Sequence, residues 1–456
     1  MSAVLRSEDV DFESEVPVLI VGAGAAGLLA ALAAHEAGVD PLVIERDAVP
    51  AGSTALSAGL IPAAGTHFQA ARGIADSPQV FAADITRKAQ GEADPKLVHT
   101  VAHGAAPLVE WLSETCAMPF EVITDFNYPG HSAQRMHGLP SRTGAELIDR
   151  LRAAVEARDI ALLPERVVET LFADADGFVE GIELRGRAGR CERIGCGALV
   201  LACSGYGGNP ALVRRHIGEM AEALYFGHPG NQGDALNWGE ALGARLAHLS
   251  GYQGHGSVAT PHNILISWAV IMQGGFQVNA QGRRFANEAL GYSEAAAEVL
   301  RQPGGIAFDI FDARIAGVAR QFEDFRNAEQ AGALITADTI EALAQRIAVP
   351  LAALRAELAV VPGVPDRFGR TLARALVPPY CAVKVTGALF HTQGGLAIDP
   401  QARVLARNGR PLPNLFAAGG AAVGVSGSGA AGYLSGNGLL TAAVLGRIAG
   451  QSAARL

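Results

Sequence analysis

The hydrophobic pattern at the start of the chain predicts a strand, a glycine turn, a helix and a second strand. Residues 16–21 form an apolar run that suits a strand buried on both faces. Gly22 interrupts this run, and the alanine- and leucine-rich segment that follows stops at Gly38, as a helix would. A second apolar run, residues 41–44, ends at Glu45. This order of elements is typical of α/β proteins with parallel strands.

Turn signals place further strands in the middle of the chain. Asp176 and Gly177 lie between the apolar residues 167–172 and 178–184, and this pattern predicts a β-hairpin. Residues 198–210 begin as another buried strand and end in a glycine turn.

The pattern changes twice along the rest of the chain. From about residue 250 to residue 391 it indicates mixed helices and short strands, and beyond that point a strand, a glycine-rich loop and a terminal helix. We therefore expect an α/β nucleotide-binding domain built from both ends of the chain, with a second domain inserted. The predicted parts are residues 1–249, 250–391 and 392–456.

Composition excludes several classes of protein. The 456 residues include 36 Lys and Arg against 45 Asp and Glu, and the net charge of −9 argues against nucleic-acid binding. With 49% hydrophobic and 18% charged residues, the chain has enough apolar surface to fold and is not disordered. Five cysteines are an odd number, which does not indicate a disulfide framework.

The chain carries no predicted membrane, export or metal signal. Its first residues are acidic and lack the apolar core of a secretory signal, and glycines interrupt the apolar residues 430–449, so we expect a cytoplasmic protein without a membrane span. His99 and His103 are spaced as metal ligands on a helix could be, but the acid of H-E-x-x-H and a third ligand are missing. No metal site is predicted.

A glycine fingerprint indicates a dinucleotide site. Gly22, Gly24 and Gly27 have the G-x-G-x-x-G spacing between a strand and a helix, and Glu45 follows about 20 residues later. These glycines permit a tight turn, a close approach of the backbone to a pyrophosphate, and close packing of helix on strand, while Glu45 would accept hydrogen bonds from ribose hydroxyls. These residues alone leave FAD and NAD open. A second match, residues 427–432, lacks both the preceding strand and the following acid.

Further motifs extend over nearly the whole chain. They are GSTALSAGL (52–60), LACSGYGGN (201–209), GRRFANE (282–288), HTQGGLAID (391–399) and SGNGLL (435–440). With the fingerprint, they resemble the fumarate reductase/succinate dehydrogenase flavoprotein family, which includes soluble fumarate reductases and 3-ketosteroid Δ1-dehydrogenases. The resemblance implies a Rossmann-like FAD-binding domain of the glutathione-reductase type and an inserted α+β capping domain.

The same resemblance implies a set of cofactor-binding residues. The family's covalent members attach the flavin to a histidine near residues 53–56, where this chain has none, so FAD is expected to be non-covalent. Residues 435–439 would bring a helix N-terminus to the flavin, where its partial positive charge stabilises the reduced form. The residues assigned to FAD are Gly22, Gly24, Ala26, Gly27, Glu45, Arg46, Ser53, Thr54, Ser57, Ala58, Gly59, Val167, Ala202, Ser204, Gly205, Asp234, Gly419, Ser435, Asn437 and Leu439.

The substrate side departs from the fumarate reductases that the chain resembles. These enzymes hold two carboxylates with histidines and arginines. His255 and His391 align with the histidines, but Tyr292 and Tyr433 stand at the arginine positions. Because the arginine fork is the group suited to bidentate carboxylate binding, we expect fumarate and succinate to be poor substrates.

The two tyrosines favour chemistry at a ketone. One tyrosine could donate a hydrogen bond to a ketone oxygen, or remove the α-proton as tyrosinate while a β-hydride passes to flavin N5. The resemblance to the 3-ketosteroid dehydrogenases implies this scheme. It also implies a second donor to the ketone oxygen, a backbone N–H at about Gly436. The main hypothesis is an FAD-dependent dehydrogenase of CH–CH bonds that desaturates a cyclic, mostly apolar ketone and passes electrons to a diffusible acceptor. Tyr128 is a further candidate for this site.

Other interpretations stay open on sequence. The alternative is a fumarate-reductase-like reductase or dehydrogenase of a carboxylic acid, held by His255, His391 and an arginine such as Arg135 or Arg142. The chain could also bind flavin without catalysis, and the tyrosines could simply pack in the core. The sequence does not identify the substrate, the electron acceptor, the direction of catalysis or the oligomeric state.

Overall fold

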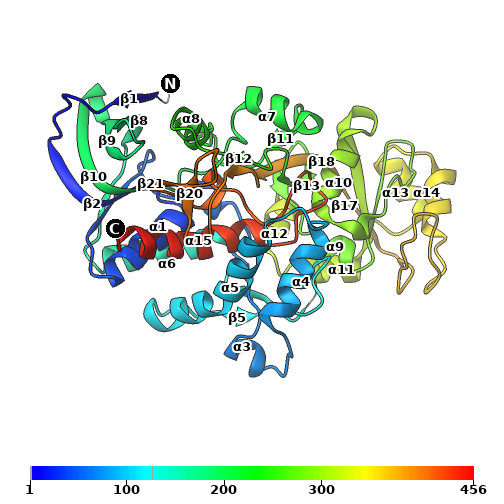
Figure 1. The fold of residues 1–456 in the computed structure, drawn as a ribbon. Coiled ribbons are helices and arrows are strands. Elements are labelled where there is room, and N and C mark those ends of the chain that lie inside the picture. Colours follow the sequence, from blue (N-terminus) through cyan, green and yellow to red (C-terminus); the bar gives the residue numbers. More distant parts are fainter. Residues whose placement is uncertain (1–2, 126) are drawn as a thin grey trace.

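The computed structural model describes residues 3–125 and 127–456, and its main layer is a nine-stranded sheet within those residues (Figure 1). Its strand order is β1-β8-β9-β10-β2-β3-β7, and β21 pairs with both β10 and β20. The strands are β1 (Ala3–Arg6), β2 (Ser14–Val21), β3 (Pro41–Ile44), β7 (Ala161–Leu163), β8 (Val167–Ala173), β9 (Val179–Arg185), β10 (Cys191–Leu201), β20 (Arg403–Leu405) and β21 (Pro411–Ala417).

The predicted strand–turn–helix–strand unit is present. Strands β2 and β3 are parallel, and helix α1 (Ala25–Glu36) connects them. Gly22 has a φ of +104°, and its N–H donates to the carbonyl of Ile44 at 2.8 Å. A Cβ on Gly27 would lie 1.8 Å from the carbonyl oxygen of Gly22, so only glycine lets α1 pack this closely on the turn. The hairpin of β8 and β9 around Gly177 is also confirmed.

The last helix, α15 (Asn437–Ala453), lies beside α1, so the two ends of the chain build one layer (Figure 1). Gly446 and Gly450 make this approach possible: a Cβ on them would lie 2.4 Å from Ala26 O and 2.0 Å from Ala30 O. The predicted domain limits at residues 249 and 391 stay a prediction.

In the described residues, a second sheet has seven strands, and its long strand β18 (Tyr380–Thr392) pairs with several of the others. The expectation of short strands in this region is wrong for β18, which has 13 residues. Most of its side chains are buried, so the strand lacks the apolar–polar alternation of a half-exposed strand. The other strands are β11 (Leu224–Tyr225), β13 (Tyr252–Ala259), β14 (Ile264–Leu265), β15 (Phe276–Val278), β16 (Ile306–Asp312) and β17 (Leu334–Ala337).

Two small sheets and the remaining helices complete the fold. The small sheets join β12 (Leu246–Ala247) to β19 (Gly395–Leu396), and β4 (Ile61–Pro62) and β5 (Glu121–Val122) to β6 (Met136–Gly138). The helices are α2 (Gly52–Ala55), α3 (His67–Ala70), α4 (Pro78–Lys88), α5 (Pro95–Thr115), α6 (Gly144–Glu156), α7 (Pro210–His216), α8 (Asp234–Ala241), α9 (Ala269–Met272), α10 (Tyr292–Leu300), α11 (Ala313–Ala319), α12 (Glu323–Gln330), α13 (Ile340–Arg346) and α14 (Leu351–Leu358).

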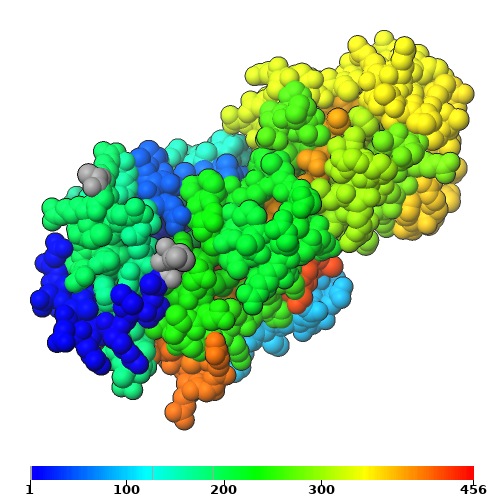
Figure 2. All heavy atoms as spheres, turned by 90° about the horizontal axis from the view of Figure 1, so that it is seen from above, coloured from blue at the N-terminus to red at the C-terminus, as the bar shows by residue number. Residues whose placement is uncertain are grey.

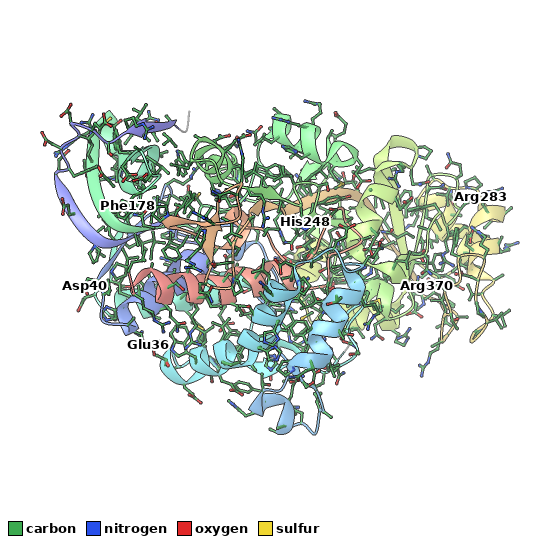
Figure 3. The ribbon with its side chains drawn as sticks, viewed as in Figure 1. Glu36, Asp40, Phe178, His248, Arg283 and Arg370 are labelled. Carbon is green, nitrogen blue, oxygen red and sulfur yellow. The ribbon has the colours of Figure 1, made fainter. Side chains whose placement is uncertain are left out.

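The molecule is elongated, with the two large sheets toward opposite ends. The space-filling view places the N-terminal residues at one end and the yellow residues of α13 and α14 at the other (Figure 2). Glu36 and Asp40 lie near the first end, and Arg283 and Arg370 lie near the second (Figure 3). In the described part of the chain, we find no helix with the length and apolarity needed to cross a membrane.

Candidate active site

A cavity of about 500 Å³ extends from the start of α1, along residues 52–59, to the end of β18 and the start of α15. The residues predicted to act on substrate all line it: His255, Tyr292, His391, Tyr433 and Gly436. The predicted cofactor residues that line it are Gly22, Gly24, Ala26, Glu45, Arg46, Ser53, Thr54, Ser57, Ala58, Gly59, Val167, Ala202, Ser204, Gly419, Ser435 and Leu439.

Four predicted cofactor residues lie behind this lining. Gly27 allows α1 to pack closely on the turn at Gly22. Asp234 forms an ion pair with Arg46, with 2.9 Å between Asp234 Oδ2 and Arg46 Nη2. Gly205 leaves room for Thr392, since a Cβ there would lie 2.1 Å from the Thr392 hydroxyl oxygen. Asn437 is buried in the first turn of α15. These four residues lie outside the lining of the cavity, and their role toward FAD stays a prediction.

Glu45 and Arg46 form the nucleotide end of the cavity. The Glu45 carboxylate is buried and accepts backbone hydrogen bonds from Ala23 at 2.7 Å and from Asp47 at 2.9 Å. Arg46 donates to the carbonyl of Gly230 at 2.7 Å in addition to its pair with Asp234. These bonds hold the acid at the carboxyl end of β3, where a ribose would meet it.

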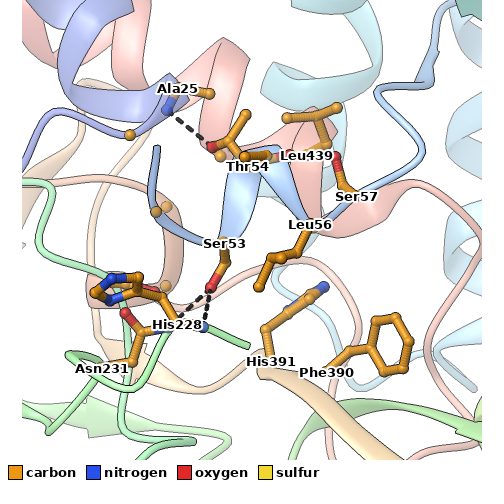
Figure 4. Close-up of a pocket in the computed structure, with 18 of the residues that line it drawn as sticks. Ala25, Ser53, Thr54, Leu56, Ser57, His228, Asn231, Phe390, His391 and Leu439 are labelled. Atoms are coloured by element: carbon orange, nitrogen blue, oxygen red, sulfur yellow. Dashed lines mark hydrogen bonds between the residues drawn. The ribbon is translucent and has the colours of Figure 1, made fainter. Parts of the chain in front are cut away.

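Hydroxyl groups fix residues 52–59, which are helix α2 and the loop after it, along the cavity (Figure 4). Thr54 Oγ1 accepts from the N–H of Ala25, the first residue of α1, at 3.0 Å. Ser53 Oγ accepts from the His228 N–H at 3.1 Å and from Asn231 Nδ2 at 2.9 Å. The loop therefore presents small side chains and backbone to the cavity, as a surface for a flat ring or a phosphate would.

The start of α15 closes the other end of the cavity. Gly436, with a φ of +84°, is the N-cap of this helix. The His391 ring rests against Gly438, where a Cβ would lie 2.3 Å from its Cε1. The Thr392 hydroxyl oxygen in the same wall is buried and has no hydrogen-bond partner in the structure. The wall thus offers a helix N-terminus to a ligand.

Both site histidines are held neutral, with Nδ1 as an acceptor. His255 Nδ1 accepts from the Ser257 N–H at 3.1 Å, and burial lowers the pKa of His255 to about 3. The Ser426 hydroxyl donates to Gln393 Oε1 at 2.7 Å, which turns the Gln393 amide N–H toward His391 Nδ1 at 3.0 Å. Burial lowers the pKa of His391 to about 4. His255 therefore carries its proton on Nε2. His391 Nδ1 lies nearer to the Gln393 amide than to the Thr392 carbonyl, which is 3.4 Å away, so the Gln393 bond favours the same Nε2–H tautomer there.

Tyr292 and Tyr433 meet in the cavity with ring centroids 6.1 Å apart; we call them the tyrosine pair. Burial raises the pKa of Tyr292 well above its ordinary value, with a further contribution from Tyr433. Burial also raises the pKa of Tyr433, to about 12, although hydrogen bonds from the Gly438 N–H and the Tyr292 hydroxyl oppose the rise. Tyr433 is therefore the member whose oxygen best carries negative charge. The predicted candidate Tyr128 also lines the cavity and packs edge-on against Tyr292.

Of the two arginines proposed to bind a carboxylate, Arg142 lines the cavity and Arg135 does not. Arg135 lies outside the cavity lining and is completely buried, with ion pairs to Asp76 at 2.8 Å and Asp84 at 2.6 Å. The expectation that it could hold a carboxylate is wrong, because two acids already neutralise it. Arg142 does line the cavity and pairs with Asp125 at 2.8 Å.

Two phenylalanines and a tryptophan of the lining were not among the predicted site residues. Phe226 and Phe390 stack with centroids 4.8 Å apart, and Trp268 packs edge-on against both His255 and Tyr292. The substrate end is thus walled by aromatic rings. His99 and His103 stack outside this lining, and the residues that the structure describes contain no cluster of three or more metal-ligating side chains.

Comparison with known proteins shows the family of the chain. The family model described as "FAD binding domain" matches residues 17–439. The chain belongs to this family. A probable fumarate reductase of Shewanella frigidimarina is 33% identical over 446 residues, which are 96% of this chain and 74% of the relative. The open conformation of a flavocytochrome c3 fumarate reductase has a TM-score of 0.81 and 30% identity, covering 97% of this chain and 79% of that one.

The fold also matches a ketosteroid enzyme. The structure of 3-ketosteroid-Δ4-(5α)-dehydrogenase from Rhodococcus jostii RHA1 in complex with 4-androstene-3,17-dione covers 100% of both chains, with a TM-score of 0.78 and 24% identity. At this identity the likeness concerns the fold. The predicted α/β FAD-binding fold is confirmed, and this flavoprotein is an FAD-dependent oxidoreductase.

Proposed function

We propose that this flavoprotein acts on a carbon–carbon bond next to a ketone, and that it desaturates a cyclic, mostly apolar ketone. The observation that carries the proposal is the tyrosine pair, which stands between two neutral histidines in an aromatic pocket. Tyrosine hydroxyls and imidazole N–H groups polarise a neutral carbonyl without requiring a charged substrate.

The roles of the residues follow from their hydrogen bonds. The His255 and His391 Nε2–H groups and one tyrosine hydroxyl can donate to a ketone oxygen, which makes the neighbouring C–H bond more acidic. The other tyrosine oxygen takes the α-proton, and the Gly438 N–H supports the charge on Tyr433. A positioned base contributes about 10²- to 10⁴-fold in rate. FAD, when bound, supplies the acceptor for the β-hydrogen and its two electrons.

The cavity wall supports an apolar ring as the substrate. The side chains of Phe226, Leu265, Trp268 and Phe390 line it beside the tyrosine pair. The structurally similar Rhodococcus enzyme is a 3-ketosteroid dehydrogenase with a bound steroid dione. The electrons then pass from the flavin to a diffusible acceptor, which completes the proposed cycle.

A second candidate is the reduction of an unsaturated carboxylic acid. Fumarate reductases are among the similar sequences, at 33% and 30% identity. Arg142 in the cavity wall is the residue that could bind a carboxylate, if its pair with Asp125 opened. The remaining arginines of the lining, Arg46 and Arg166, lie at the Glu45 end. Against this candidate, the tyrosine pair carries no positive charge.

An anaerobic reduction test separates the two candidates. The purified yellow holoenzyme is mixed with matched panels of cyclic ketones and saturated carboxylic acids, and the visible flavin band is followed. We expect bleaching by at least one ketone and none by succinate. Bleaching by carboxylic acids alone would overturn the proposal and favour the second candidate.

A further inference from the structure

A β-bulge in β13 follows directly after the site histidine His255. Between the residues that pair with Ala388 and Thr386 of β18, strand β13 has two residues where β18 has one. Gly256 and Ser257 are these two residues, and they form the bulge. Bulges beside active sites redirect side chains, and here the Ser257 N–H donates to His255 Nδ1 at 3.1 Å. The bulge therefore determines which nitrogen of His255 carries the proton.

The Asp309 carboxylate of β16 holds this bulge with both of its oxygens. Oδ2 accepts from the Ser257 hydroxyl, and Oδ1 accepts from Gln277 Nε2 at 2.9 Å. Gln277 Nε2 also donates to the carbonyl of Gly256 at 2.8 Å. The three polar side chains are buried, and β13 and β16 pair with opposite edges of β18. Both residues of the bulge are thus fixed to one carboxylate, Ser257 directly and Gly256 through Gln277.

Helix α10 packs on the bulge and brings a tyrosine of the site to it. A Cβ on Gly256 would lie 2.7 Å from Ala295 Cβ, so the bulge and the helix are in close contact. Tyr292 is the first residue of α10, and its ring stacks on that of His255 with 4.8 Å between the ring centroids. A displacement of the bulge would therefore move the His255 donor relative to the tyrosine pair.

The hydrogen bonds of Asp309 depend on its charge. Burial raises the pKa of Asp309 to about 7, and the bonds from Ser257 of β13 and Gln277 of β15 oppose the rise. The charged group that acts on it is Glu288, which adds to the rise and is itself in ion pairs with two arginines. The carboxylate accepts both bonds, whereas the protonated acid must use one oxygen as a donor. The ionised form therefore holds the bulge better.

We propose that Asp309 is a positioning residue that keeps His255 ready to donate to the ketone oxygen. This inference rests on the proposed function, in which the His255 Nε2–H polarises the ketone. Asp309 lies outside the cavity lining and acts through Ser257 and Gln277 on the bulge. It thereby keeps the ring proton on Nε2 and the ring against Tyr292, so the donor is in place before the ketone binds.

Nitrogen NMR of the oxidised holoenzyme tests the state of the His255 ring without any substrate. Histidine is isotope-labelled, and His255→Gln identifies the signals of this ring. At a pH above the pKa of Asp309, the wild type should show the Nε2–H tautomer alone. Asp309→Ala removes both acceptors and should give a mixture of tautomers, while Asp309→Asn keeps one acceptor and should give a smaller change. Asp312→Asn on the same strand, where Asn can still cap α11, should leave the His255 signals unchanged.

Anaerobic flavin reduction, with the ketone that reduces the wild type fastest, tests the consequence for chemistry. In Asp309→Asn we expect about a tenfold lower rate constant at saturating ketone. The ketone concentration for half-maximal rate should stay near that of the wild type, because the donor acts in the transition state. The wild-type rate should fall as the pH falls through about 7, and Asp309→Asn, which has the shape of the protonated acid, should lack this fall. Adding Ser257→Ala to Asp309→Asn should slow the reaction no further, since both act through one contact.

Two results would overturn the proposal: an unchanged His255 tautomer in both Asp309 variants, or a wild-type rate constant and pH profile in Asp309→Asn. A residue that serves folding alone would give these results together with a lower free energy of unfolding. If Asp309→Ala does not retain FAD, Asp309→Asn and Ser257→Ala serve for both measurements. If no ketone reduces the flavin, the proposed function fails separately, and the NMR spectra still decide whether Asp309 fixes the His255 proton.

Discussion

At the scale of single residues, the chemistry depends on where protons lie. The Ser257 N–H and the Gln393 amide occupy Nδ1 of the two site histidines, so both rings donate from Nε2. The tyrosine pair adds two hydroxyls, of which Tyr433 has the better stabilised oxygen. These two imidazole N–H groups and two hydroxyls are neutral donors. They suit the oxygen of a ketone better than a carboxylate, whose binding needs a positively charged side chain.

Removing either hydroxyl of the tyrosine pair should slow chemistry without affecting cofactor binding. We expect Tyr292→Phe and Tyr433→Phe to reduce the rate of flavin reduction about 10²- to 10³-fold, the loss measured when a stabilising donor is removed. Stopped-flow absorbance and the FAD content of the purified variants check both statements. Tyr380→Phe, at the distant start of β18, is the matched control. Full turnover in both site variants would exclude the mechanism.

The Gln393 amide should determine which nitrogen of the His391 ring carries the proton, because it donates to Nδ1. Gln393→Met removes the donor to Nδ1, so the ring proton can move there and Nε2 loses its fixed role. We expect about a tenfold lower rate, from about 1.4 kcal/mol of lost hydrogen-bond energy. Nitrogen NMR of His391 should show the change of tautomer. The control is Gln401→Met on the exposed turn before β20, and an unchanged His391 spectrum in Gln393→Met would contradict the assignment.

At the scale of elements, the cavity depends on the contact of α1 with α15, because each of these helices presents its N-terminus to it. Small residues at the contact set the distance between the helices, and a side chain added there meets backbone rather than a flexible group. The geometry of both cavity ends is therefore coupled to one helix pair.

A single methyl group should disturb this helix pair. Gly446→Ala places a Cβ 2.4 Å from Ala26 O, and we expect a loss of about 1–3 kcal/mol in the free energy of unfolding, together with weaker FAD binding. Gly317→Ala, inside α11 with open space around it, should be neutral or stabilising by about 0.5–1 kcal/mol. Urea unfolding and FAD titration measure both. Equal stability of the two variants would refute the packing argument.

The sequence predicted correctly those elements that are determined by residues close together along the chain. The turn at Gly22, the helix after it and Glu45 lie within one short segment, so spacing alone located them. The length of β18 was missed because its strand character comes from partners far along the chain, such as Thr386 beside Ile306. The role of Arg135 was misjudged for the same reason: its acids lie 59 and 51 residues away.

At the scale of the whole molecule, buried titratable groups link stability to pH. Burial lowers the pKa of His131, His137 and His391 to about 4 and that of His255 to about 3, below the ordinary 6.5. Between these values the unfolded chain binds protons that the folded protein does not, so stability falls as pH falls. Asp309 has the opposite effect on stability and cancels the contribution of one histidine, because burial raises its pKa to about 7.

Four histidines against one carboxyl leave a net uptake of about three protons on unfolding between about pH 6.5 and about pH 4. We expect the free energy of unfolding to fall by roughly 4 kcal/mol per pH unit in this window, at about 1.4 kcal/mol per proton. Urea unfolding at several pH values gives the slope. His137→Gln should remove about one proton from it, and a flat or opposite slope in the wild type would contradict the buried neutral state.

The central claim concerns the substrate, and one product analysis tests it most directly. A single anaerobic turnover of the oxidised holoenzyme with the most reactive cyclic ketone is quenched, and the product is identified by mass spectrometry and NMR. The account predicts a product that has lost two hydrogens, with the new C=C bond conjugated to the carbonyl, in an amount equal to the flavin reduced. Recovery of unchanged ketone from the whole panel, with turnover confined to carboxylic acids, would contradict it.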